Sequence, residues 1–365
     1  MNEKLIHWKD LFDFVTNVMI QLNVREEDAK KVADNLVIAN LRGVDSHGVA
    51  RLKRYVDGIK TGYIIPDVQP KIVKETALMA NVDGQNGLGQ VAGVFGMELV
   101  LKKTRKQGIG MVTVFNSNHY GIAGYYSMMA LKHDFIGISM TNSSPLVVPT
   151  FSRDALIGTN PISVAVPTKK NRPWVLDMAT SVVPRGKLEV YNRLGKKLPD
   201  GWATDETGRG TNDPARVLRN LLDRLGGGIF PLGGEGELHS GHKGYGMSVM
   251  VDIFSALLSG SNFGPDVVNK KNGRVTFPRV GHMFMAIDPD YFVGKEVLKD
   301  KMDEYIDLLK NSKKAEGQAR VYVHGEKEYE KHEIREKEGI PLDAKTVESL
   351  LKISEEFNVP IQFKE

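Results

Sequence analysis

The chain has 365 residues, a formal net charge of +4 and no cysteine. The near balance of 49 basic and 45 acidic residues excludes nucleic-acid binding by bulk electrostatics, and the missing cysteines exclude disulfides, thiolate metal sites and a cysteine nucleophile. The first residues lack the basic and apolar regions of a signal peptide, and no apolar run is long enough to span a bilayer. We therefore expect a cytoplasmic protein that binds neither nucleic acid nor membranes.

Helical spacing of apolar residues predicts two amphipathic helices within the first 40 residues. A third helix is expected to begin at Asp45 or Ser46, both good N-caps, and to end at Gly62. From residue 77 onward, apolar strands alternate with helices. We predict strands at 77–82, 110–115, 136–140, 163–166, 174–176, 283–287 and 320–324, and helices at 89–106, 125–133, 245–259 and from 295. This alternation is typical of an α/β fold.

Two short patterns suggest sites but lack the residues that would support them. Residues 87–92, Gly-Leu-Gly-Gln-Val-Ala, match the dinucleotide fingerprint, but the acidic residue expected about 20 positions later is missing. Glu237, His239 and His242 could together bind a metal ion, but they lie among glycines that disfavour the helical backbone needed for convergence. We expect no Rossmann site and no metal, and keep a metal-dependent hydrolase as a remote alternative.

Polar clusters at the ends of predicted elements are the candidates for chemistry. In the predicted third helix, His47, Arg51 and Tyr55 are spaced four residues apart and would share one face. Such a face suits a carboxylate bound by arginine beside a proton-transferring histidine, although an N-capped surface helix has the same pattern. A second cluster, which contains His119, follows the predicted strand 110–115.

A third group of small polar residues follows the next strands, at 141–145, 158–161 and 177–181. Backbone N–H groups and hydroxyls in such turns suit phosphates and ribose, and Lys187 and Lys243 could supply countercharge. Each turn alone could equally be an ordinary connection.

Seven motifs carry a resemblance to a known family. They are DSHGVAR, NSNHYGIAGYY, GTNPI, DMATS, PDGW, HSGHKGYG and GIPLD, in this order. The chain resembles the malate/L-lactate dehydrogenase family, which also contains ureidoglycolate, sulfolactate and diketogulonate enzymes and cyclic-imine carboxylate reductases. The resemblance extends from about residue 5 to residue 345.

The resemblance implies a non-Rossmann nicotinamide-binding domain and a helical second domain built from both chain ends. It divides the chain into an N-terminal, substrate-side segment (1–110), a central cofactor-binding domain (111–294) and a C-terminal segment that packs on the N-terminal part (295–365). It also implies a homodimer with NAD or NADP as cofactor.

The resemblance also implies roles for individual residues. His47, His119, Ser46 and Asp177 are expected in the catalytic centre, with Asp177 relaying charge through Ser46, and Arg51 and Tyr55 on the substrate side. Expected cofactor contacts are Ser143, Thr159, Asn160, Asp177, Met178, Ala179, Thr180, Lys187, Lys243, Gly325 and Glu326. His324 replaces the proline that usually precedes the last pair.

The activity implied is hydride transfer between a nicotinamide and C2 of a 2-hydroxy or 2-oxo acid, with malate first and lactate second. The cofactor supplies the hydride chemistry, and the protein orients and polarises the substrate. Reduction of a cyclic imino acid on the same scaffold is the main alternative.

Overall fold

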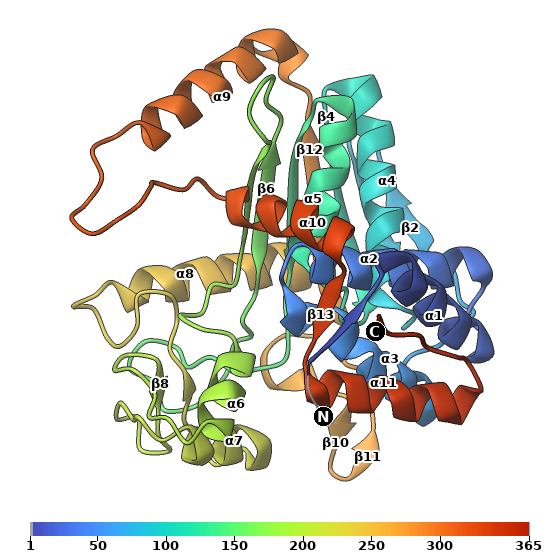
Figure 1. The fold of residues 1–365 in the computed structure, drawn as a ribbon, viewed down its shortest axis with the longest axis vertical. Helices are drawn as coiled ribbons and strands as arrows, with labels where there is room; N and C mark the ends of the chain where they lie inside the picture. Colours follow the sequence, from blue (N-terminus) through green and yellow to red (C-terminus); the bar gives the residue numbers. More distant parts are fainter. Residues whose placement is uncertain (1–2, 365) are drawn as a thin grey trace.

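The structure is a computed structural model that describes residues 3–364. Its centre is a seven-stranded sheet with the order β2-β3-β4-β12-β5-β6-β7 (Figure 1). The strands are Lys71–Glu75 (β2), Met79–Asp83 (β3), Ile109–Ser117 (β4), Val280–Ile287 (β12), Ile136–Thr141 (β5), Ile162–Val166 (β6) and Trp174–Met178 (β7). β3 and β4 run parallel, and the other neighbouring pairs are antiparallel. The predicted mixed α/β class is confirmed.

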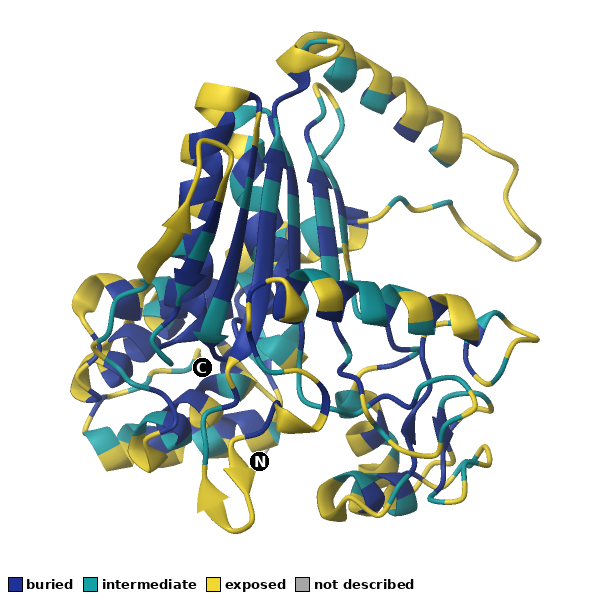
Figure 2. Cartoon of the chain, turned by 180° about the vertical axis from the view of Figure 1, so that it is seen from behind, coloured by how far each residue is buried: buried dark blue, intermediate teal, exposed yellow. Residues whose placement is uncertain are grey.

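Helices pack along one face of this sheet, whereas the other face is largely open and a helix crosses only its lower end (Figure 2). Helix α4 (Gly89–Gln107) connects β3 to β4 and packs on one face together with α5 (Ala123–Met129). On that face the ring of Phe284 lies 5.3 Å from the ring of Tyr126. On the other face, Met283 packs in a cluster with Val251 of α8 (Gly241–Asp252), which continues into a π-helical turn, Ile253–Leu257.

The two ends of the chain form one helical layer. β1 (Lys4–Ile6) pairs antiparallel with β13 (Ile340–Leu342), so segments more than 300 residues apart lie side by side (Figure 1). The helices of this layer are α1 (Trp8–Gln21), α2 (Glu26–Leu41), α3 (Leu52–Thr61), α10 (Glu326–Glu338) and α11 (Ala344–Phe357). Apolar residues from both ends share one buried core.

A smaller core lies below one end of the sheet (Figure 1). Most of its residues belong to the stretch of chain that connects β7 to α8. It is built from α6 (Arg185–Arg193), α7 (Pro214–Asp223) and the short pair β8 (Ala203–Thr204) and β9 (Gly228–Ile229). The remaining elements are the exposed hairpin β10 (Lys270–Lys271) and β11 (Arg274–Val275), and helix α9 (Lys295–Lys310).

The division into residues 1–110, 111–294 and 295–365 stays a prediction. A boundary after residue 110 would cut the unit β3-α4-β4, whose two strands pair directly from Met79–Met111 to Asp83–Phe115. The packing of the helical layer, in contrast, joins both ends of the chain as the division assumes.

Two expected elements are wrong, and several were missed, among them β2, α6, α7 and α11. The third helix begins at Leu52, because residues 45–51 form two 3-10 turns. Residues 320–323 form no strand; His324 O accepts a hydrogen bond from Val175 N (3.2 Å) at the edge of the sheet, without a ladder. β2 was missed because all five of its residues are exposed, which leaves no alternation of buried and exposed positions to detect.

No helix within residues 3–364 is both long and apolar enough to cross a membrane.

Candidate active site

A cleft of about 570 Å³ lies where the helical layer meets the edge of the sheet at β7. Five segments line it: the turn after α2, the start of α5, the residues before β6, the end of β7 with the residues after it, and the residues around the start of α10. Of the residues predicted from the sequence, Ser46, His47, Thr159, Asp177, Met178, Ala179 and Gly325 line this cleft. The segments are distant in sequence, so the cleft depends on the tertiary fold.

Hydrogen bonds from α2 hold the turn that carries His47. Asn40 Nδ2 donates to Asp45 Oδ1 (2.7 Å), while Asn40 Oδ1 accepts from Val49 N (2.8 Å). Arg335 of α10 donates to both oxygens of Asp45, at 2.7 and 3.1 Å. At Gly48 a Cβ atom would lie 2.1 Å from Asn40 Oδ1, so this close approach requires glycine.

This turn corrects one prediction about the geometry. His47, Arg51 and Tyr55 do not share one continuous helix face, because Gly48 is extended (ψ −148°) and α3 begins only at Leu52. His47 lies on the cleft wall, whereas Arg51 Nε donates to Ser46 O (2.6 Å) and Tyr55 is buried.

His119 follows β4 and stacks on His47, with 5.5 Å between the ring centroids and 23° between the planes. The hydroxyl of Tyr55 lies 2.7 Å from His119 Nδ1, and Gly121 N donates to the same atom (3.3 Å). At Gly89, a Cβ atom would lie 2.3 Å from Asn118 O and 2.4 Å from His119 O. Gly89, one of the glycines of the apparent dinucleotide fingerprint, therefore lets the start of α4 lie against the backbone of His119.

Both histidines are neutral at pH 7. Burial, followed by the charges of Arg51 and Arg54, lowers the pKa of His47 to about 4. Burial, followed by the charge of Arg54 and the ring of His47, holds the pKa of His119 well below its usual value. Burial raises the pKa of Tyr55 to about 12, so its hydroxyl keeps its proton.

The hydrogen bonds define where the proton lies on His119 but not on His47. Because a backbone N–H can only donate, the bond from Gly121 leaves His119 Nδ1 as an acceptor, and the proton of the neutral ring is on Nε2. His47 Nδ1 lies 3.0 Å from Ser46 Oγ, which can donate or accept. His47 can therefore change its protonation while it keeps this partner, whereas the Nδ1 contact of His119 is fixed.

Asp177 lies at the end of β7 and opens onto the cleft. Its Oδ2 accepts a hydrogen bond from Gly124 N (2.8 Å). Burial raises its pKa to about 6, although the Gly124 N–H and Arg42 act in the opposite direction. Between residues 3 and 364 no hydrogen bond joins Asp177 to Ser46, so the relay of charge through Ser46 stays a prediction.

Three predicted cofactor contacts support Thr159 rather than line the cleft. Ser143 Oγ lies 3.3 Å from Thr159 Oγ1 and accepts from Thr159 N (3.0 Å). Asn160 Oδ1 accepts from Ser143 N (3.1 Å), and Thr180 Oγ1 donates to Asn160 O (3.0 Å). The turns are thus joined by hydrogen bonds, and one of their residues, Thr159, lines the cleft.

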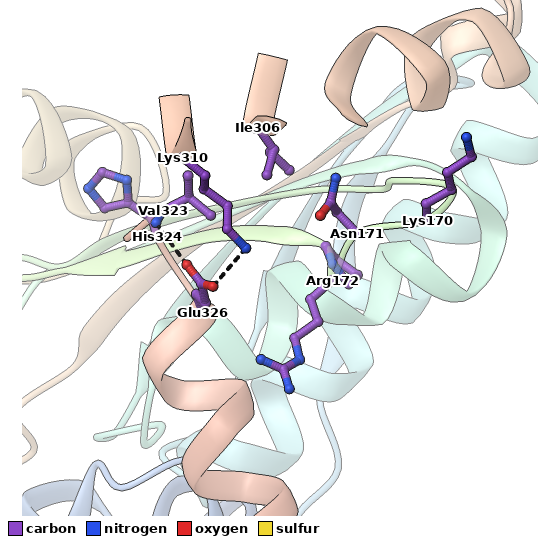
Figure 3. A pocket seen from close by; sticks show the side chains of 9 residues that line it. Lys170, Asn171, Arg172, Ile306, Lys310, Val323, His324 and Glu326 are labelled. Atoms are coloured by element: carbon purple, nitrogen blue, oxygen red, sulfur yellow. Dashed lines mark hydrogen bonds and ion pairs between the residues drawn. The ribbon is translucent and has the colours of Figure 1, made fainter. Parts of the chain in front are cut away.

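Gly325 and Glu326 face different cavities. Gly325 lines the cleft, whereas Glu326 lines a neighbouring cavity of about 240 Å³ together with Arg172 and Lys310 (Figure 3). Lys310 Nζ donates to Glu326 Oε1 (2.8 Å), and Val323 N donates to Glu326 Oε2 (3.2 Å). These partners hold the pKa of Glu326 below its usual value, although burial acts in the opposite direction.

Lys187 and Lys243 are exposed and do not line the cleft. Their expected role in cofactor binding stays a prediction. Sequence reasoning missed Arg42, which lines the cleft, is 5% exposed and stacks on Tyr329 at 4.6 Å from its ring. Its place three residues before the DSHGVAR motif was the available signal.

Glu237, His239 and His242 are exposed. Within the described residues, no group of three or more histidine, aspartate or glutamate side chains is arranged to hold a metal ion.

Known proteins resemble this chain over nearly all of its length. A model of the malate/L-lactate dehydrogenase family matches residues 6–351. Malate dehydrogenase of Pyrococcus abyssi is 50% identical over 352 residues, which cover 96% of this chain and 94% of that protein. L-sulfolactate dehydrogenase of Methanocaldococcus jannaschii is 39% identical over 348 residues, covering 95% of this chain and 96% of that protein.

Solved structures agree with the sequence relatives. The crystal structure of malate dehydrogenase from Entamoeba histolytica matches with a TM-score of 0.94 and 37% identity, covering 99% of this chain and 100% of that chain. Malate dehydrogenase from Pyrococcus horikoshii matches with a TM-score of 0.89 and 46% identity, covering 99% of this chain and 97% of that chain. The chain therefore belongs to the malate/L-lactate dehydrogenase family and is an oxidoreductase.

Proposed function

We propose that the protein is an NAD(P)-dependent dehydrogenase that interconverts a 2-hydroxy acid and the corresponding 2-oxo acid, with malate as the first candidate and lactate as the second. The observation that carries this proposal is the stacked pair His47 and His119, held neutral beside the cleft. Neutral imidazoles suit this reaction, because a proton and a hydride leave the substrate together and the proton needs an acceptor near pH 7.

The cleft has the groups that a nicotinamide dinucleotide needs. Its apolar walls include Ile122, Val175 and Met178, which suit a flat ring, and its polar groups include Thr159 and Asp177, which suit a ribose. Arg42 and Lys327 on the same walls can neutralise phosphates. Bound there, the cofactor would supply the hydride acceptor or donor.

The two histidines have different roles in this proposal. His119 presents Nε2–H, which holds and polarises the substrate oxygen at C2. His47 exchanges the proton with that oxygen, because Ser46 Oγ can follow a change in its protonation. Arg51 holds the carboxylate, so that C2 faces the nicotinamide.

Two further expectations follow from family membership and are part of the proposal. The protein forms a homodimer, which analytical ultracentrifugation tests. Its cofactor is NAD or NADP, which the following experiment separates.

The test crosses NADH and NADPH with oxaloacetate, pyruvate and a cyclic imino acid, and follows the absorbance of the reduced nicotinamide. We expect oxaloacetate to be reduced with at least one cofactor, and chelators to leave the rate unchanged. Reduction of the imine alone would replace the proposal with an imine reductase. Absence of turnover in all arms, or loss of activity with a chelator, would contradict it.

A further inference from the structure

Gln90, in the first turn of α4, has a fully buried side chain without regular hydrogen bonds. The residue has no exposed surface, and within residues 3–364 neither its Nε2 nor its Oε1 forms a hydrogen bond of regular geometry. Buried amides nearly always have partners, because an amide that loses its water without gaining another bond costs free energy. An apolar side chain of the same size would avoid that cost, so packing alone does not account for a glutamine here.

Gln90 lies beside the residues that hold His119. The preceding residue, Gly89, packs directly against the backbone of His119, since a Cβ atom there would overlap the His119 carbonyl oxygen. The following residue, Val91, belongs to the same buried cluster as Tyr55, whose hydroxyl lies 2.7 Å from His119 Nδ1. Burial raises the pKa of Tyr55 to about 12, and hydrogen bonding by the Gln90 amide is one of the influences that lower it.

Two further unpaired amide oxygens belong to residues that touch the loop that carries His119. A Cβ atom at Gly121 would overlap Asn35 Oδ1, and the backbone oxygen of Asn86 accepts from a side-chain nitrogen of the loop (3.1 Å). Together with the two atoms of Gln90, these oxygens make four of the eight buried side-chain atoms without a partner in the described part of the chain. The unpaired polar groups therefore gather around one candidate catalytic residue, which favours a functional reason for them.

The directions of the hydrogen bonds limit what Gln90 can do. His119 Nδ1 is an acceptor, as its bond from Gly121 N requires, so the Tyr55 hydroxyl donates to it. An oxygen whose proton is used in this way can only accept from a third group, and Gln90 therefore pairs with it through Nε2–H. The result is a chain of donors that runs in one direction and ends at His119 Nε2–H. Each bond in such a chain polarises the next.

We propose that Gln90 is a positioning residue for His119: its Nε2–H donates to the Tyr55 hydroxyl and directs the proton of that hydroxyl to His119 Nδ1. This inference rests on the proposed function, in which His119 Nε2–H holds the substrate oxygen at C2. Catalytic hydrogen bonds are often long in the free enzyme and shorten in the complex with substrate, which accounts for the loosely held amide. Polarisation of the ring matters most in the transition state, when negative charge develops on the substrate oxygen.

Gln90→Met tests this role, because methionine has nearly the same size and cannot donate. We expect kcat for the reduction of oxaloacetate to fall about 10-fold with little change in KM, which is less than the roughly 10²–10³-fold loss caused by removing a donor that touches the reacting oxygen. The Tm should stay the same or rise, because an unpaired buried amide is removed. A lower Tm with an unchanged kcat would show a purely structural role and overturn the proposal.

Tyr55→Phe removes the middle of the chain of donors and provides a second comparison. If Gln90 acts through Tyr55, Gln90→Met should cause no further loss of kcat in a protein that already carries Tyr55→Phe. An equal loss in both backgrounds would show that Gln90 does not act through this hydroxyl.

Gln107→Met is the matched control. Gln107 is exposed at the other end of the same helix, so the same substitution there changes the amide without touching the site. We expect this variant to keep the wild-type kcat. A fall as large as in Gln90→Met would show a general effect on α4 and contradict the assignment.

Nitrogen NMR of protein with isotope-labelled histidine separates this inference from the proposed function, because it needs no turnover. The resonances of His119 are assigned by their loss in His119→Ala. We expect Tyr55→Phe to shift the Nδ1 resonance toward that of a nitrogen without a hydrogen bond, and Gln90→Met to shift it in the same direction by a smaller amount. That result supports the positioning role even if oxaloacetate is not reduced. An Nδ1 resonance that Gln90→Met leaves unchanged overturns the role even in an active dehydrogenase.

Discussion

The histidine pair beside the cleft and His282 in the sheet show two uses of the same side chain. His282 lies in β12 with no exposed surface; its Nδ1 is 2.7 Å from Thr141 Oγ1 and its Nε2 is 2.7 Å from Ser117 Oγ. Its ring stacks on Tyr120, with centroids 4.5 Å apart. Both nitrogens and one face of this ring are therefore engaged by the protein.

His47 and His119 are half-buried, and each keeps Nε2 without a protein partner in the described residues. Burial lowers the pKa at all three positions, to about 3 at His282, so the pKa alone does not separate the two histidines proposed to be catalytic from the histidine in the sheet. The free Nε2 separates them, because proton transfer needs a nitrogen without a protein partner, and His47 also lies on the cleft wall.

Removal of either histidine of the pair should have the largest effect. We expect His47→Ala and His119→Ala to lower kcat by roughly 10²–10⁴-fold, the usual contribution of a general acid or base. Circular dichroism and the Tm should stay close to wild type, because neither ring fills the core. Near-normal turnover in both variants would remove the pair from the catalytic centre.

Substitution of His282 should instead change stability. We expect His282→Ala to lower the free energy of unfolding by about 3 kcal/mol, because a cavity forms and the hydroxyls of Ser117 and Thr141 lose their buried partner. Urea denaturation measures this change. His282→Phe keeps most of the ring volume and separates packing from hydrogen bonding. A loss of turnover as large as in His119→Ala, at unchanged stability, would contradict the structural role.

The pH dependence of stability offers a smaller and more specific test. Because the pKa of His282 is about 3 in the folded protein, below its ordinary value, the unfolded chain binds more protons between these pH values. His282 therefore makes the protein less stable as the pH falls from about 6.5 toward 3, by up to about 1.4 kcal/mol per pH unit.

His282→Phe lacks this titration. The stability difference between wild type and this variant should therefore narrow as the pH is lowered from about 7.5 to about 5, as measured by urea denaturation. The raised pKa of Asp177, about 6, changes the stability in the opposite direction as the pH falls. Both proteins contain Asp177, so its effect cancels in the difference between their stabilities. A constant difference over this range would contradict the low pKa of His282.

Much of the fold was predictable from local patterns. Most predicted strands of the central sheet and the first two helices correspond to elements of the structure, because each has a clear period of apolar residues. The failures have physical causes. The predicted helix from residue 45 is interrupted because Asn40, in the preceding helix, binds Asp45 and Val49 and requires an extended Gly48.

The candidate site was predictable in its residues and less so in its geometry. The motifs named His47, His119 and Asp177, and the structure brings the two histidines into contact. No local pattern could place Glu326 in a different cavity from Gly325, or bring Arg42 to the cleft, because these positions depend on how α10 docks on α2 and β7.

The sequence by itself determined the family, the alternation of strands and helices and the types of residue available for chemistry, because motifs and periodicity are local properties. The tertiary structure decided which nitrogen of each histidine is free, which buried amides lack partners and which residues line the cleft. Those properties arise from contacts between segments that are distant in the chain, such as Tyr55 with His119 and Arg335 with Asp45.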